Sequence, residues 1–284
     1  MLGDLDAAHA AFRQALHQAA GDREVLTTAY RGLARTYLVR GEPDKAIREL
    51  KKALAEDPGD LEAATTLGEM LLAEPGTRDE IALVTLERVD RQDEGRLEAA
   101  ALTVLGRLQA HAGRPDDARR TLERARALPS LVSPQRTEAL LALAEIAVAR
   151  ADLAAGHALL LEALAVAPAD PRPHLRLAEL HQATQNPTAA LAAYDRALAL
   201  AESSSVLSAA LHVAIAIGDT ERSVRLARRL IVLAPGAPIA EVALALADPD
   251  ARTAVARLAS RHPDALDVQL EAARVEFAAG SFAT

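Results

Sequence analysis

Residues 27–60 read TTAYRGLARTYLVRGEPDKAIRELKKALAEDPGD, and this stretch decides the fold. On either side of Gly41 its apolar residues recur at three- and four-residue spacing, which is the pattern of a helix with one apolar face. Glycine between two such segments is typical of a helix end. Pro58 closes the second segment. The stretch therefore predicts two helices joined by a short turn.

The same signals recur along the chain with a constant spacing. A glycine before a short acidic turn is found at Gly3, Gly41, Gly113 and Gly218. Gly3 and Gly41 lie 38 residues apart, and Gly41 and Gly113 lie 72 apart, close to two further units. Prolines that follow runs rich in Ala, Leu and Arg provide a second set of markers, at Pro58, Pro168, Pro235 and Pro263. The repeat period is therefore in the mid-thirties, which predicts an array of helix pairs.

The order of large and small residues within one period resembles the tetratricopeptide repeat (TPR) family over nearly the whole chain. In residues 27–60 the first helix carries a large residue, a leucine, a small residue and a second large residue, at Tyr30, Leu33, Ala34 and Tyr37. The second helix carries Ala46, Leu50 and Ala53, and Pro58 follows it. The resemblance implies an all-α, right-handed α-solenoid of stacked antiparallel helix pairs, a TPR-like superhelix. A solenoid of the HEAT or armadillo kind is the alternative fold, but its units are longer.

We expect one TPR-type solenoid over residues 1–284. The units are a partial unit at 1–21, units at about 27–60, 61–96, 99–132, 137–170, 171–204 and 204–237, a short unit at 238–265, and a partial unit at 266–284. The unit at 61–96 carries about two extra residues at its turn, AEPGTRDE. The short unit must have a short first helix, around residues 239–247.

The two ends look like repeat interiors and carry no polar cap, which terminal repeats normally need. The chain therefore reads as a fragment of a longer array, with Phe12, Phe277 and Phe282 as joints to further units. Self-association through the uncapped ends is a further option.

Helix starts and small residues are also marked in the sequence. Four pairs place a capping side chain before a proline at the first helical position: Ser133-Pro134, Asp170-Pro171, Asn186-Pro187 and Asp248-Pro249. Small residues recur at one position of the first helices and should let paired helices approach closely: Ala34, Gly68, Gly106, Ala144 and Ala178.

Composition excludes several classes of protein. Half the residues are hydrophobic but only 2% are aromatic, so alanine and leucine, both strong helix formers, supply the apolar mass. The net charge of −8 argues against a nucleic-acid partner, which needs a basic face. The absence of cysteine excludes disulfides and thiolate sites. No apolar run is long enough to predict membrane insertion. A reducing cytoplasm and an oxidising periplasm both tolerate a chain without cysteine, so the sequence selects no compartment.

The sequence contains none of the motifs that phosphate binding or catalysis would need, such as GxxxxGK, HExxH or GxSxG. His174 and His181 lie two turns apart on one helix face, but they occupy the positions of large packing residues, so we interpret them as core residues. The prediction is a chain that is not an enzyme, with no catalytic residues, cofactor or metal site.

In the TPR family the first helices of successive pairs line a concave groove, and the resemblance carries this onto the present sequence. The candidate protein-binding residues are Arg31, Arg35, Leu38, Glu62, Glu69, Leu72, Arg107, His111, Leu141, Glu145, Arg172, Leu175, Glu179 and His212. This row mixes both charges with apolar residues, which suits a peptide that docks through apolar anchors. It contains no lysine, so the carboxylate clamp that some family members use for chaperone C-termini is disfavoured.

The function that the sequence favours is a protein–protein interaction scaffold that binds a peptide or protein segment in the concave groove. The alternative is a sensory or assembly arm of a larger enzyme, regulator or bacterial envelope export system whose active part lies outside this chain.

Overall fold

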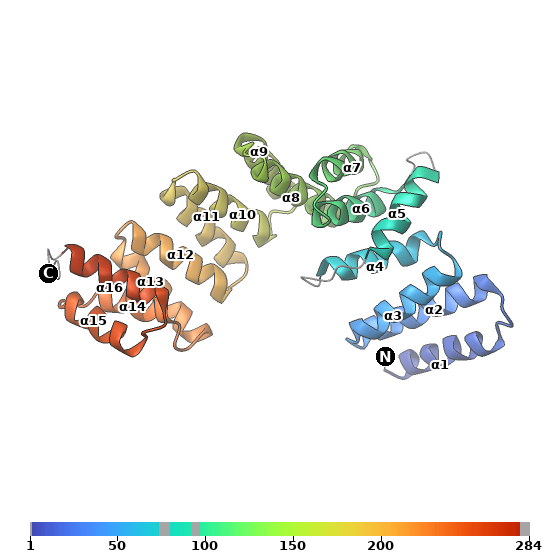
Figure 1. Ribbon diagram of the computed structural model, residues 1–284, viewed down its shortest axis with the longest axis horizontal. Coiled ribbons are helices and arrows are strands. Elements are labelled where there is room, and N and C mark those ends of the chain that lie inside the picture. The colour runs from blue at the N-terminus through green and yellow to red at the C-terminus, as the bar shows by residue number, and fades with distance from the viewer. Residues whose placement is uncertain (1, 74–79, 93–96, 279–284) are drawn as a thin grey trace. The chain divides into compact units, whose positions relative to one another are not determined.

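The computed structural model describes residues 2–73, 80–92 and 97–278, and within these ranges the chain forms sixteen α-helices and no β-strand (Figure 1). The predicted all-α architecture is therefore confirmed. The chain divides into two compact units, Met1–Ala151 and Asp152–Thr284, which are described one at a time.

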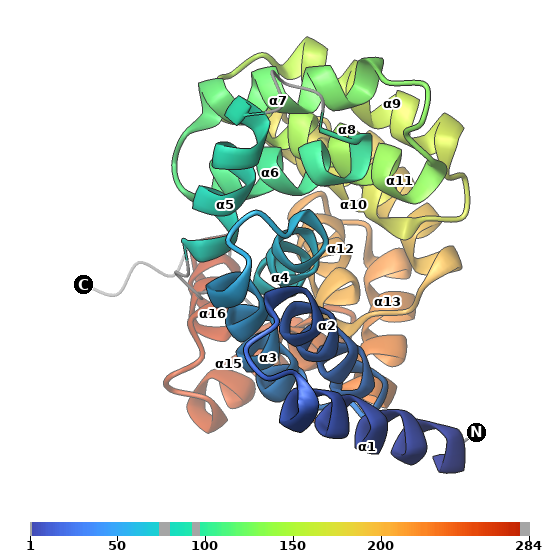
Figure 2. The same ribbon diagram turned by 90° about the vertical axis from the view of Figure 1, so that its right-hand side faces the viewer.

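Unit 1 is built from helices that pack with their neighbours in sequence, most extensively α2 with α3 and α6 with α7. The first helices of neighbouring pairs also touch one another, α4 with α6 and α6 with α8 (Figure 2). The helices are α1 (Leu2–Gln18), α2 (Arg23–Val39), α3 (Pro43–Glu56), α4 (Leu61–Ala73), α5 (Ile81–Gln92), α6 (Ala99–His111), α7 (Pro115–Ala127) and α8 (Ser133–Ala149).

Unit 2 repeats this arrangement. Its helices pair as α10 with α11, α12 with α13 and α14 with α15, while α12 touches α14 and α14 touches α16. The first helices of its pairs therefore stack side by side. The helices are α9 (Leu153–Val166), α10 (Pro171–Ala183), α11 (Pro187–Leu200), α12 (Ser204–Ala216), α13 (Thr220–Leu233), α14 (Pro238–Leu246), α15 (Ala251–Arg261) and α16 (Leu266–Ala278).

The small residues of the first helices are buried where other helices approach them. A Cβ atom added to Gly106 would lie 2.6 Å from Leu122 Cγ of α7, the partner of α6. A Cβ atom at Gly68 would lie 2.5 Å from Val104 Cγ1 of α6, the first helix of the next pair. The close approach predicted for the two helices of a pair is confirmed at Gly106. At Gly68 the close neighbour is the first helix of the next pair. The alanines at this position are each at most 2% exposed: Ala34, Ala144 and Ala178.

The turns inside the pairs use the left-handed conformation that glycine adopts without strain. Gly41, Gly113 and Gly218 have φ angles of +71°, +73° and +73°. After α2, the Gly41 N–H donates to Leu38 O at 3.0 Å and the Glu42 N–H donates to Tyr37 O at 2.9 Å, which satisfies carbonyl groups at the helix end. Two other turns place a residue with a side chain in the same conformation, Ala151 at φ +61° and Gln185 at φ +55°.

Two of the four predicted helix caps are confirmed and two are wrong. The side chains of Asp170 and Asn186 accept from the backbone N–H groups of the first turns of α10 and α11. Ser133 instead lies inside α8, whose N-cap residue is Val132. The helix after Asp248 starts two residues later than predicted, and Asp250 caps it because its side chain reaches the Thr253 N–H. Asp248 accepts from the Asp250 N–H in the preceding turn.

Ion pairs between residues 34 apart reproduce the period read from the sequence. Arg40 after α2 pairs with Asp6 of α1, and Arg150 after α8 pairs with Asp116 of α7. In both, an arginine at the end of a first helix meets an aspartate of the preceding second helix. The arginine guanidinium lowers the pKa of Asp116. Exposed ion pairs of this kind contribute little to stability. Their recurrence shows that the same contact between neighbouring repeats is made at two places in unit 1.

The predictions for irregular regions have mixed outcomes. Phe12 packs against Gly32 of α2, so its side chain makes a contact inside unit 1. Phe277 is 70% exposed, and Phe282 lies outside the described residues. The extra residues predicted at the turn of the repeat at 61–96 also lie largely outside the described residues. The short first helix expected around residues 239–247 is confirmed as α14, with 9 residues.

Candidate protein-binding groove

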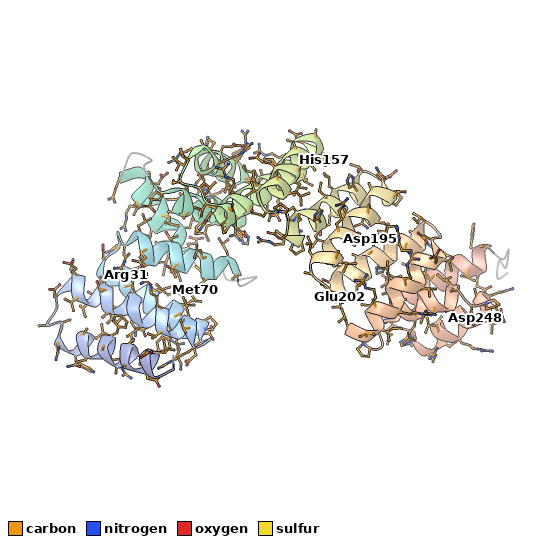
Figure 3. All side chains as sticks on the ribbon, turned by 180° about the vertical axis from the view of Figure 1, so that it is seen from behind. Arg31, Met70, His157, Asp195, Glu202 and Asp248 are labelled. Atoms are coloured by element: carbon orange, nitrogen blue, oxygen red, sulfur yellow. The ribbon has the colours of Figure 1, made fainter. Side chains whose placement is uncertain are left out.

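Arg31 and Arg35, both predicted to face a ligand, form ion pairs between α2 and the start of α4. Arg31 Nε lies 3.3 Å from Asp60 Oδ2, and both guanidinium groups contact the Glu62 carboxylate (Figure 3 labels Arg31). Asp60 is 8% exposed and its Oδ1 accepts from the Ala63 N–H at 3.0 Å. These arginines therefore join neighbouring helix pairs, and much of their charge is neutralised within unit 1.

The remaining predicted residues of unit 1 fall into two groups. Arg107 lies 3.1 Å from Glu138 of α8, a second ion pair between first helices. Leu141 is only 8% exposed, so it packs inside the unit and offers little surface to a ligand. The others are exposed or half-buried on the first helices: Leu38, Glu69, Leu72, His111 and Glu145.

In unit 2 the predicted residues on α10 also interact within the chain. Arg172 Nη2 lies 2.7 Å from Asp170 Oδ2, and this hydrogen bond lowers the pKa of Asp170. Glu179 accepts from Arg176 at 2.9 Å, and Leu175 is half-buried. His212, the last residue of the predicted row, lines a pocket of unit 2.

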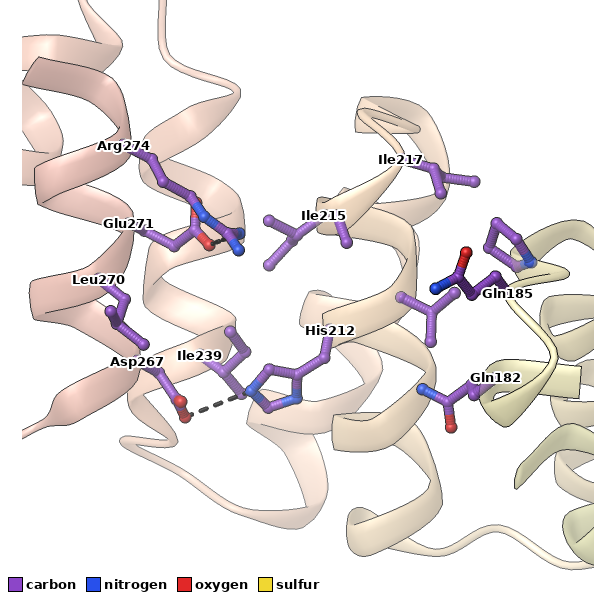
Figure 4. Close-up of a pocket in the computed structure, with 13 residues that line it drawn as sticks. Gln182, Gln185, His212, Ile215, Ile217, Ile239, Asp267, Leu270, Glu271 and Arg274 are labelled. Carbon is purple, nitrogen blue, oxygen red and sulfur yellow. Dashed lines mark hydrogen bonds and ion pairs between the residues drawn. The ribbon is translucent and has the colours of Figure 1, made fainter. Parts of the chain in front are cut away.

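This pocket, called here the α12–α16 pocket, has a volume of about 530 Å³. It lies among the first helices of three successive pairs, α12, α14 and α16, with the α10–α11 turn at one side (Figure 4). Its lining residues are Gln182, Gln185, Pro187, His212, Val213, Ile215, Ala216, Ile217, Ile239, Asp267, Leu270, Glu271 and Arg274. Ile215 also packs against the buried cluster of Val242, Leu258 and Val268, so the wall of the pocket is continuous with the core.

The two glutamines place amide groups on one side of the pocket. Tyr194 Oη donates to Gln182 Oε1 at 2.5 Å, so the amide NH₂ of Gln182 is left to face the pocket (Figure 4). Tyr194 is 1% exposed, and burial raises its pKa to about 12, with the Glu179 carboxylate adding to the shift. The phenol therefore stays protonated and keeps Gln182 oriented as a donor.

Charged groups line the opposite side, on α16. His212 Nε2 lies 3.3 Å from Asp267 Oδ2, and Arg274 Nη1 lies 2.5 Å from Glu271 Oε1. Figure 4 shows Asp267 and Glu271 on one side of the α12 residues and Gln182 and Gln185 on the other. Between the two polar sides the surface is formed by Ile215, Ile217 and other apolar residues. The pocket can therefore hold a large apolar side chain and bind polar groups at both sides.

The histidines interpreted as core residues are partly buried on α10. Desolvation lowers the pKa of His174, and desolvation together with the nearby His157 lowers the pKa of His181. The rings of His157 and His181 meet edge to face with centroids 5.8 Å apart (Figure 3 labels His157). In the described part of the chain, no group of three His, Asp or Glu side chains is placed to hold a metal ion.

The sequence pattern did not identify most residues of the α12–α16 pocket because the predicted row stopped at α12. Asp267, Leu270, Glu271 and Arg274 belong to α16, the first helix of the final pair. The repeat phase could have extended the row to α16, since its residues follow Pro263 as other first helices follow their prolines. Gln185 carried no signal, because it lies in a turn.

Comparisons with known proteins agree with this geometry. The sequence matches the tetratricopeptide repeat family over residues 1–71 and again over residues 141–205. The chain contains tetratricopeptide repeats. The matched segments lie in both units. No curated protein matches the sequence.

Solved structures of TPR-type solenoids superpose on large parts of the chain. PilW, a type IV pilus biogenesis factor, matches with a TM-score of 0.65 at 18% identity, over 77% of this chain and 98% of PilW. Pseudomonas aeruginosa PilF matches with a TM-score of 0.59 at 20% identity, over 77% and 96%. Yeast Tom70 matches with 0.56 at 17% identity, over 97% of this chain and 58% of Tom70. At these identities the likeness shows the fold alone.

Tetratricopeptide repeats generally form non-catalytic scaffolds that bind proteins, and the fold found here supports an interaction scaffold in general. Within the described ranges, none of the helices combines the length and the apolar character that a bilayer crossing requires.

Proposed function

We propose that this chain is a protein-interaction scaffold that binds a segment of a partner protein in the groove of unit 2, with a large apolar side chain of the partner in the α12–α16 pocket. The observation that carries the proposal is the pocket itself, about 530 Å³ in volume and lined by successive first helices of TPR pairs. Pockets of this size and apolar character are typical of ligand sites.

The lining supports a peptide partner in particular. Leu270 is 52% exposed and Ile217 is 44% exposed, so apolar surface is available to be buried on binding. The amide NH₂ of Gln182 faces the pocket and can donate to a main-chain carbonyl of an extended segment. The arginines of unit 1 support the proposal less, because Arg31 and Arg35 already pair with Glu62.

The test compares pull-downs from a native extract by the wild-type chain, the Leu270→Glu variant and a matched control. Leu270→Glu places a charge at the pocket without emptying a buried site. Val232→Glu makes the same kind of change on α13, at a residue that is 79% exposed and does not line the pocket. We expect proteins bound by wild type and by V232E to be depleted at least about tenfold with L270E, which corresponds to about 1.4 kcal/mol.

Circular dichroism at 222 nm establishes that both variants keep their helices. If L270E and V232E retain the same proteins in the same amounts as wild type, the pocket is not the binding site and the proposal is wrong.

A further inference from the structure

His212 faces two hydrogen-bond acceptors at once. Its Nδ1 lies 2.8 Å from the carbonyl oxygen of Ser208, and its Nε2 lies 3.3 Å from Asp267 Oδ2. A carbonyl oxygen can only accept, so Nδ1 carries a hydrogen and donates it to Ser208. Nε2 faces the carboxylate of Asp267 on α16.

The Asp267 carboxylate can accept from a ligand as well. A carboxylate has two oxygens with about four lone-pair sites, and the contact with His212 is made by Oδ2. The Asp267 side chain is 50% exposed, so it can be reached from the pocket. An ammonium or guanidinium group there would make a charge-assisted hydrogen bond to the carboxylate.

The charges that line the pocket favour the same kind of ligand. Asp267 and Glu271 contribute two carboxylates to the lining, and Arg274 contributes one guanidinium. Arg274 lies 2.5 Å from Glu271, so these two charges compensate each other. Asp267 is the other carboxylate of the lining, and a basic group of a partner can reach it.

The apolar surface begins directly beside this carboxylate. Leu270 is one helical turn after Asp267 on α16, and Ile215 is one turn after His212 on α12, so both lie on the same helix faces as the polar pair. Figure 4 shows Leu270 next to Asp267, with Ile239 close to His212. A segment that seats an apolar side chain here brings its neighbouring side chains within reach of Asp267.

We propose that the α12–α16 pocket selects protein segments in which a large apolar residue is adjacent to a lysine or arginine, the apolar side chain lying against Ile215 and Leu270 and the cation pairing with Asp267. This inference rests on the proposed function, and it names the class of partner that the groove accepts.

The probe is a phage-displayed library of random peptides, selected on the full-length chain. Three variants accompany the wild type: Asp267→Asn, which removes the charge and keeps the shape; Asp264→Asn, which removes an exposed charge three residues away outside the pocket; and Leu270→Glu. One selected peptide is then synthesised with its basic residue and with norleucine in that place, and both affinities are measured by fluorescence polarisation.

We expect wild type and D264N to select peptides with a basic residue next to Leu, Ile, Met or Phe. Both should bind the basic peptide about two- to five-fold more tightly than the norleucine peptide, as an exposed ion pair allows. D267N should still bind both peptides and lose the preference.

The two proposals fail separately. If L270E abolishes binding but wild type selects peptides without a basic residue, or if D267N keeps the preference, the groove stands as a binding site and the basic specificity is wrong. If L270E binds the selected peptides as well as wild type does, the pocket is not the site and both proposals fall. Self-association that L270E abolishes, measured by sedimentation velocity, would make a second copy the occupant and overturn the peptide class.

Discussion

Replacing Gly106 with alanine should destabilise the chain, although alanine is the better helix former. In an open helix the change stabilises by about 1 kcal/mol. Here the new Cβ would lie 2.6 Å from Leu122 Cγ and 2.8 Å from Leu122 Cδ2, well inside the ordinary carbon–carbon contact of about 3.5–4.0 Å. The change therefore sets helix propensity against packing.

Packing should win because the neighbours of Gly106 cannot give way easily. Leu122 is fully buried, and the backbone oxygen of Ala118 lies 3.3 Å from the new Cβ. Overpacking of such a site costs up to about 3 kcal/mol, which exceeds the propensity gain and leaves a net loss of about 1–2 kcal/mol. Urea unfolding followed by circular dichroism measures the loss. Amide exchange should place it in α6 and α7, since repeat stability is largely local.

A double-variant cycle separates this clash from other effects. Leu122→Ala alone should cost about 2–5 kcal/mol. Combined with Gly106→Ala it makes room for the new methyl group, so the double variant should lose less stability than the sum of the two single variants, by about 1 kcal/mol or more. Gly113→Ala is the matched control, because that site has φ +73° and no atom within 4 Å. It should cost about 1 kcal/mol and add to L122A without coupling. A stabilising G106A, or additivity of G106A with L122A, would show that no clash with Leu122 limits this position.

Three further predictions concern turns, caps and pH. Ala151→Gly should raise stability by about 1 kcal/mol in urea unfolding, since φ is +61° there, whereas Gly41→Ala should lower it by a similar amount; equal signs would contradict the turn assignment. Asp170→Ala should cost about 1 kcal/mol because the side chain caps α10, while Ser133→Ala should be close to neutral because Ser133 caps nothing; the two midpoints measured side by side decide this. Burial lowers the pKa of His181 in the fold, so stability is present above the unfolded value of about 6.5 and is lost as the pH falls from there toward the lowered folded pKa. His181→Tyr should therefore lose less melting temperature than wild type between about pH 7.5 and about pH 5.5, and an equal loss would show that this histidine does not govern the pH dependence.

The sequence predicts the fold well because each repeat encodes its own hairpin. Gly41, Gly113 and Gly218 adopt the left-handed φ that their position implies, and the small residues of the first helices are buried as expected. These are local effects, which a period in the sequence makes visible many times over. The division into numbered units and the groove row stay predictions.

The two wrong cap predictions involve choices between neighbouring residues. Ser133 and Asp248 are acceptable caps by residue type, but Val132 and Asp250 hold the cap positions, because helix starts are ambiguous by one or two residues. The groove row stays a prediction, but the sequence did not indicate that Arg31 and Arg35 pair with Glu62 of the following helix pair. That contact joins residues far apart in the sequence, and a periodic pattern does not report such partners.

The departure from the period at α14 is what connects the sequence to the candidate site. α14 has 9 residues, whereas α12 and α16 on either side have 13 each, so α14 is about 6 Å shorter, roughly one helical turn. A shorter middle helix covers less of its two neighbours, and the α12–α16 pocket has walls from α12 and α16 with Ile239 as the contribution of α14. His212 and Asp267, which belong to alternate first helices, meet across it. In a solenoid of equal units the helix between them would separate such residues, so the irregular repeat is the one that brings a histidine, a carboxylate and an apolar surface together.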